Sequence, residues 1–131
     1  MTNNPRVTGI GGVFFKARDQ AQLGEWYRRH LGIDVQEGGW AVFRWRDHED
    51  PTRPGSTVWS VFPEDTEYFG KTGQRAMINY RVADLDAVLA ALKREGVPVD
   101  ERVEDTAEGR FGWITDPDGN RIELWQAPPG R

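Results

Sequence analysis

The chain has 131 residues, enough for one domain with a buried core, and its 37% hydrophobic and 29% charged residues are typical of a folded globular protein. A formal net charge of −4 argues against a nucleic-acid partner, because the phosphate backbone is itself negative. The absence of cysteine excludes disulfides, thiolate nucleophiles and zinc–thiolate sites. No stretch approaches the ~20 apolar residues of a membrane span, so we expect a cytoplasmic protein without a membrane partner.

The first half of the chain predicts a strand, a helix and further strands. Residues 7–19 read as a strand by alternation, and residues 20–30 carry apolar positions at helical spacing that end at Gly32. Strands then follow in "GWAVFRWR", in "STVWSVFPED" and, more weakly, at residues 33–36.

The second half repeats this order of elements. Asp19 and Asp84 stand 65 positions apart, as do Lys16 and Arg81. Strands are predicted at residues 97–103, 110–115 and 121–126, and the turn "DPDGN" joins the last two. We therefore predict an α+β fold in a single domain, residues 1–131, made of two tandem β-α-β-β-β modules at about 7–68 and 74–127. A ferredoxin-like sandwich and a plain α+β meander stay open as alternatives.

Three segments, "GIGGVFFKARDQAQLGEWYRRHLGI", "INYRVADLDAVLAALKREGV" and "FGWITDPDGNRIELWQ", resemble the vicinal oxygen chelate superfamily, which includes glyoxalase I, extradiol dioxygenases and bleomycin-resistance proteins. The resemblance implies a curved, open eight-stranded sheet with the helices outside and a ligand pocket inside. It also implies a homodimer, because many members are dimers.

The resemblance also supplies positions for a metal site, since metal-dependent members hold the ion with two histidines and a carboxylate or other oxygen ligand from each module. In this chain the two histidine positions fall on Gly12 and Met77, and the first oxygen position falls on Trp59 or Ser60. Only Glu123 keeps a ligand side chain. We therefore expect no metal and no other cofactor, because a divalent ion in a catalytic site usually has three protein ligands or more.

Strand alternation then predicts which side chains line the pocket. If Gly12 and Met77 point inward, the neighbouring alternate positions do so too, and tryptophans add aromatic wall. The predicted ligand-binding residues are Phe14, Lys16, Trp40, Trp59, Met77, Asn79, Arg81, Trp113, Glu123 and Trp125. Glu123 is also the candidate catalytic residue, as a general base. A structural alternative pairs Glu123 with Arg81 or Lys16 as an internal salt bridge.

Three functions remain open at this stage. The first is metal-free binding of a small aromatic or amphipathic molecule, of the kind seen in bleomycin-resistance proteins. The second is an enzyme of the same superfamily, a lyase, isomerase or dioxygenase with or without a metal. The third is a non-catalytic interaction module in which aromatic side chains fill the pocket.

Overall fold

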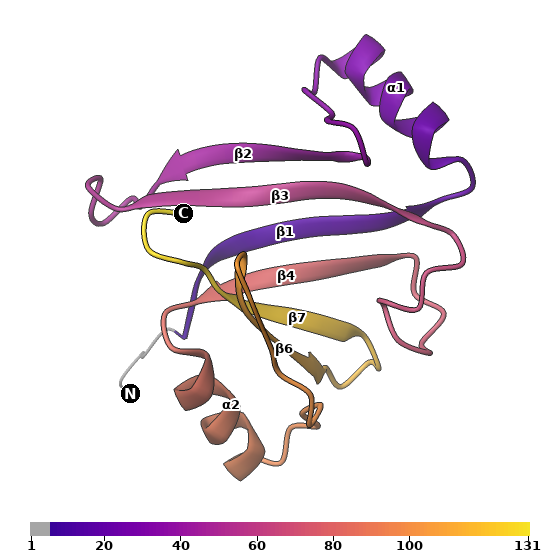
Figure 1. Cartoon of the computed structure of the whole chain (residues 1–131). Coiled ribbons are helices and arrows are strands. Elements are labelled where there is room, and N and C mark those ends of the chain that lie inside the picture. Colours follow the sequence, from indigo (N-terminus) through magenta and orange to yellow (C-terminus); the bar gives the residue numbers. More distant parts are fainter. Residues whose placement is uncertain (1–5) are drawn as a thin grey trace.

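The computed structural model describes residues 6–131, which form two helices and seven strands (Figure 1). In chain order the elements are β1 (Val7–Ala17), α1 (Gln20–Leu31), β2 (Trp40–Arg46), β3 (Pro54–Pro63), β4 (Ala76–Val82), α2 (Leu85–Arg94), β5 (Glu104–Thr106), β6 (Gly109–Thr115) and β7 (Arg121–Gln126). No helix among the described residues is long and apolar enough to cross a membrane.

All seven strands belong to one mixed sheet in the order β2-β3-β1-β4-β7-β6-β5. The centre of the sheet is the antiparallel pair β1 and β4, and each of these two strands has a parallel partner on its other side, β3 and β7 respectively. Strands from the first half of the chain therefore lie on one side of this central pair and strands from the second half on the other. The module boundaries at about 7–68 and 74–127 stay a prediction.

The predicted count of eight strands is corrected to seven in the described part of the chain. Residues 33–36 make only one isolated bridge, from Gln36 to Trp40, because Gly38 and Gly39 turn the chain back at once with φ of 96° and 86°. Residues 97–103 likewise make one bridge, Val99 to Ile114, and the strand that forms nearby is the short β5.

Helix α1 begins at Gln20, as predicted, and an aspartate caps the start of each helix. Asp19 accepts a hydrogen bond from the Gln22 amide at 3.0 Å, and Asp84 accepts one from the Ala87 amide at 3.1 Å. The end of α1 is also confirmed, since Gly32 takes a left-handed φ of 68° at the C-cap.

The sheet has two different faces, and the predicted alternation in β1, β4 and β7 is confirmed. On the helix face, Phe15 and Ala17 pack with Tyr27 of α1, and Leu124 packs with Leu89 of α2. On the opposite face, which we call the cavity face, the buried apolar cluster is Phe14, Phe69, Met77 and Trp113. Because the helices cover only one face, the other is left to form a site.

Candidate functional site

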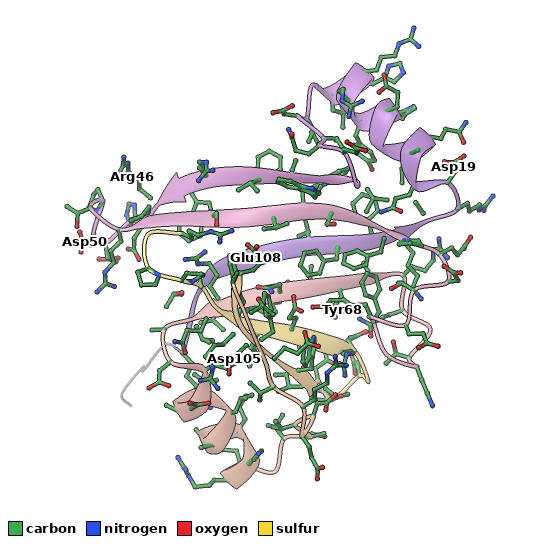
Figure 2. All side chains as sticks on the ribbon, viewed as in Figure 1. Asp19, Arg46, Asp50, Tyr68, Asp105 and Glu108 are labelled. Carbon is green, nitrogen blue, oxygen red and sulfur yellow. The ribbon has the colours of Figure 1, made fainter. Side chains whose placement is uncertain are left out.

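A cavity of about 430 Å³ opens on the cavity face of the sheet. Aromatic side chains from several strands and loops form much of its wall, namely Phe14, Trp40, Phe62, Tyr68, Phe111 and Trp125. Tyr68 and Glu108, both labelled in Figure 2, reach it from the loop after β3 and from the turn between β5 and β6. Apolar walls with a few polar groups are characteristic of small-molecule sites.

The strand register places one row of residues across the cavity face through Glu123. Its members, from β3 to β6, are Val58, Gly12, Asn79, Glu123 and Trp113. The positions that the resemblance assigns to the superfamily's other ligands, Met77 and Trp59 or Ser60, lie outside this row, and Ser60 pairs with Phe14 of β1. Met77 pairs with Phe14, next along β4, and Trp59 neighbours Val58 and so points to the helix face.

This row does not fit the metal site of the superfamily. Gly12 has no side chain and Val58 is apolar, so the row offers one carboxylate and one amide. Between residues 6 and 131 no group of three or more His, Cys, Asp or Glu side chains is arranged to hold a metal ion.

Glu123 lies at the floor of the cavity, and its side chain is only 1% exposed. One carboxylate oxygen accepts a hydrogen bond from the Tyr68 hydroxyl, and the other accepts one from Asn79 Nδ2 at 2.6 Å. Neither Arg81 nor Lys16 forms an ion pair with it in the described structure, so the internal salt bridge is not the arrangement found. Glu123 is held instead by neutral donors.

Burial has the largest effect on the pKa values of Glu123 and Tyr68. It raises the pKa of the Glu123 carboxyl, while hydrogen bonds from Tyr68 and Asn79 and the nearby Trp113 N–H act in the opposite direction. Trp113 Nε1 has no hydrogen-bond partner of standard geometry in the described residues. Burial, and then the charge of Glu123, raise the pKa of Tyr68 far above its usual range. The Tyr68 hydroxyl therefore keeps its proton, which lies in the hydrogen bond to Glu123.

A β-bulge in β1 brings Gly11 to the cavity wall beside Gly12. A Cβ on Gly11 would lie 2.1 Å from Asn79 Oδ1 and 2.9 Å from the Trp125 ring. Only glycine leaves room for these side chains, so the bulge determines how Asn79 is placed against Glu123.

Arg81 is packed between two tryptophan rings, 4.9 Å from Trp125 and 5.5 Å from Trp45. It donates to the backbone oxygen of Ser56 at 3.3 Å and to that of Arg131. Burial lowers its pKa, as expected for a guanidinium removed from water without a carboxylate partner. Arg81 thus supports the wall behind Trp125 and ties down the segment that carries Arg131.

The structure brings some of the predicted binding residues together at the cavity and separates others. Those that line it are Phe14, Trp40, Asn79, Glu123 and Trp125. Met77 and Trp113 are buried in the apolar cluster below, and Trp59 packs against Phe15 and Tyr27 on the helix face. Lys16 lies over the Phe69 ring and borders a groove along α1.

Tyr68 is not among the predicted ligand-binding residues, although it contacts Glu123 directly. Tyr68 lies in the link between the halves, where no periodicity assigns a direction to its side chain. The other lining residues outside the predicted set are Gly11, Val42, Arg44, Ser56, Val58, Phe62, Glu108, Phe111 and Arg131. Alternation from Trp40 would have pointed to Val42 and Arg44, which follow it on the same face of β2.

Comparison with known proteins agrees with this fold. The sequence matches the family described as the Glyoxalase/Bleomycin resistance protein/Dioxygenase superfamily over residues 9–124. Comparison with curated protein sequences gives no match.

Several solved structures share the fold. Methylmalonyl-CoA epimerase from Mycobacterium tuberculosis has 23% identity and a TM-score of 0.63, covering 98% of this chain and 94% of that one. A variant of the Streptomyces coelicolor methylmalonyl-CoA epimerase, in complex with 2-nitronate-propionyl-CoA, has 23% identity and a TM-score of 0.65, covering 90% and 96%. A Legionella pneumophila structure described as an NAD-dependent benzaldehyde dehydrogenase has 14% identity and a TM-score of 0.59, covering 89% and 98%. At these identities the likeness concerns the fold alone.

Proposed function

The chain belongs to the Glyoxalase/Bleomycin resistance protein/Dioxygenase superfamily, and from that premise we propose that it binds a small aromatic or amphipathic molecule in its cavity without a metal. One observation carries this proposal. The 430 Å³ cavity has aromatic walls and a single buried carboxylate, Glu123, held by hydrogen bonds at its floor.

The aromatic walls favour a flat ligand. Phe111 and Trp125 are stacked with an angle of 7° between their ring planes, and Phe62 is stacked on Tyr68 at 13°. Rings held in this way lose little conformational freedom when a ligand packs against them. A planar body of one or two rings fits such a volume.

A second candidate is an isomerase-type or epimerase-type enzyme. Solved structures of this fold include epimerases, and Glu123 and Tyr68 both line the cavity and form a direct hydrogen bond. A buried carboxylate with a raised pKa is suited to accept a proton from a carbon acid. The test is exchange of solvent deuterium into enolisable thioesters and ketones, which wild-type protein should catalyse and Glu123→Gln should not.

We also propose a homodimer, which the edge strand β2 supports. Trp40 and Phe43 of β2 are 44% and 48% exposed, and β2 has a hydrogen-bonded neighbour on one side only. Apolar side chains on an unpaired edge are typical of an interface. Sedimentation velocity at micromolar concentration should give the mass of two chains.

Binding can be tested with bicyclic aromatic probes such as 2-naphthol and 2-naphthoate, by thermal shift and calorimetry with and without EDTA. The matched variants are Trp40→Ala, in the cavity, and Trp26→Ala, a 50% exposed tryptophan on α1. We expect binding that EDTA does not change, that Trp40→Ala weakens and that Trp26→Ala leaves intact. A cavity that takes none of the probes would favour the interaction module instead.

A further inference from the structure

We propose that the floor of the cavity binds the hydrogen-bond-donating end of its ligand, a hydroxyl or N–H group, and that the mouth binds an anionic group at the other end. This rests on the proposed binding function and names the class of ligand. The ligand is then a planar aromatic acid with a hydrogen-bond donor opposite its carboxylate.

The hydrogen-bond donors at the floor of the cavity are already paired with Glu123. Glu123 accepts from the Tyr68 hydroxyl and from Asn79 Nδ2, and a carboxylate has no hydrogen to donate. Because Asn79 turns its NH₂ group to Glu123, its carbonyl oxygen must point the other way. The side chains around Glu123 are thus ordered by the two oxygens that accept their hydrogen bonds.

The hydrogen-bond acceptors at the floor, in contrast, lack donors within the described residues. Asn79 is 1% exposed, and its Oδ1 is buried without a hydrogen-bond partner among the described residues. This oxygen lies against Gly11, and both residues line the cavity. The Tyr68 oxygen, whose hydrogen goes to Glu123, also keeps its lone pairs. A ligand that reaches the floor therefore meets acceptors, and a buried acceptor without a donor is costly.

The mouth of the cavity carries two arginines. Arg44 and Arg131 line the cavity and are both exposed, in contrast to Glu123 and Asn79. Arg131 is paired with Glu108 at 2.7 Å, and Arg44 has no ion pair within residues 6–131. The guanidinium of Arg44 is thus available to a ligand carboxylate. The ligand therefore binds with its carboxylate at the mouth and its hydrogen-bond donor at the floor.

Three naphthoates that differ at one atom position test the floor. 6-Hydroxy-2-naphthoate has the donor, 6-methyl-2-naphthoate replaces it with a group of similar size, and 6-methoxy-2-naphthoate keeps an acceptor only. We expect the hydroxy compound to bind about tenfold more tightly than the other two, the size of effect for one hydrogen bond to a buried acceptor. Calorimetry or naphthoate fluorescence measures the three dissociation constants.

Single substitutions test which residues cause these differences in affinity. Asn79→Leu should remove the preference for the hydroxy compound. If that variant does not fold, the comparison of the three probes on the wild-type protein still tests the proposal. Arg44→Gln should weaken all three naphthoates by about two- to fivefold and reduce the salt dependence of binding. Its neighbour Arg46, on the same strand but outside the lining of this cavity, provides the control Arg46→Gln, which should change nothing.

The outcomes separate this inference from the proposed function. If all three naphthoates bind equally in a Trp40-dependent way, the cavity binds aromatic acids and the donor preference is refuted. If the methoxy compound binds best, the floor presents donors and the assignment of Asn79 is reversed. If no naphthoate binds at all, the binding function itself is contradicted, and this inference with it.

Discussion

Replacing Gly11 by alanine should disrupt the floor of the cavity. The added Cβ would lie 2.1 Å from Asn79 Oδ1, 2.9 Å from Trp125 Cε3 and 3.0 Å from Arg81 Cγ. Carbon atoms do not approach an oxygen or another carbon this closely, so Asn79 has to move. Its hydrogen bond to Glu123, 2.6 Å long, then breaks.

The size of the effect follows from two costs. Forcing one extra methyl into a packed site costs about 1–3 kcal/mol. Breaking the Asn79–Glu123 hydrogen bond leaves buried polar groups unpaired, which costs about 1–3 kcal/mol more. We therefore expect Gly11→Ala to lower the free energy of unfolding by about 2–6 kcal/mol and to abolish naphthoate binding.

Denaturant unfolding of four proteins measures this effect: wild type, Gly11→Ala, Asn79→Ala and the double variant. In the double variant the oxygen that clashes is gone, so the two substitutions should cost less together than the sum of their separate effects. Gly24→Ala is the control, because Gly24 is buried inside α1, with Val35 Cγ1 3.3 Å from the added Cβ, and alanine favours helix. Equal stability of Gly11→Ala and wild type, or additive effects in the cycle, would refute the placement of Asn79 against Gly11.

Three further outcomes are expected. Tyr68→Phe should lower the free energy of unfolding by about 1–3 kcal/mol in urea titrations, since Glu123 loses one of its two hydrogen bonds, and an unchanged stability would contradict that contact. Because burial raises the pKa of Glu123 in the folded state, wild-type stability should fall as pH rises above about 4.5, the usual value for this carboxyl, until the raised pKa is reached. Glu123→Gln should lack that fall, and parallel stability profiles of the two proteins would contradict the raised pKa. Trp59→Phe should lower the melting temperature but leave naphthoate affinity unchanged, because Trp59 packs on the helix face, and weakened binding would show that this face takes part.

Local pattern was sufficient for much of the fold. The alternation in β1 separates Phe14 from Phe15, and the structure places them on the cavity face and the helix face. The capping aspartates Asp19 and Asp84 mark the starts of both helices. These features depend on the geometry of neighbouring residues, which the order of amino acids determines directly.

The local sequence pattern does not determine strand register. A shift of one position along β3 exchanges Val58 for Trp59 and moves the side chain to the other face of the sheet. The sequence placed Trp59 at the pocket, whereas hydrogen bonding between β1 and β3 sets Val58 opposite Gly12. Register is fixed by pairing between distant segments, and the alternation in one strand does not reveal it.

The sequence by itself therefore determined the two helices, most of the strands and their faces, and it singled out Glu123. Only the tertiary structure decided what surrounds that carboxylate. Tyr68 comes from a loop 55 positions earlier in the chain, and Asn79 faces Glu123 because β4 and β7 pair in parallel at that point. The chemistry of the cavity depends on these distant contacts, because a buried carboxylate takes its pKa and its hydrogen bonds from the groups that the fold places beside it.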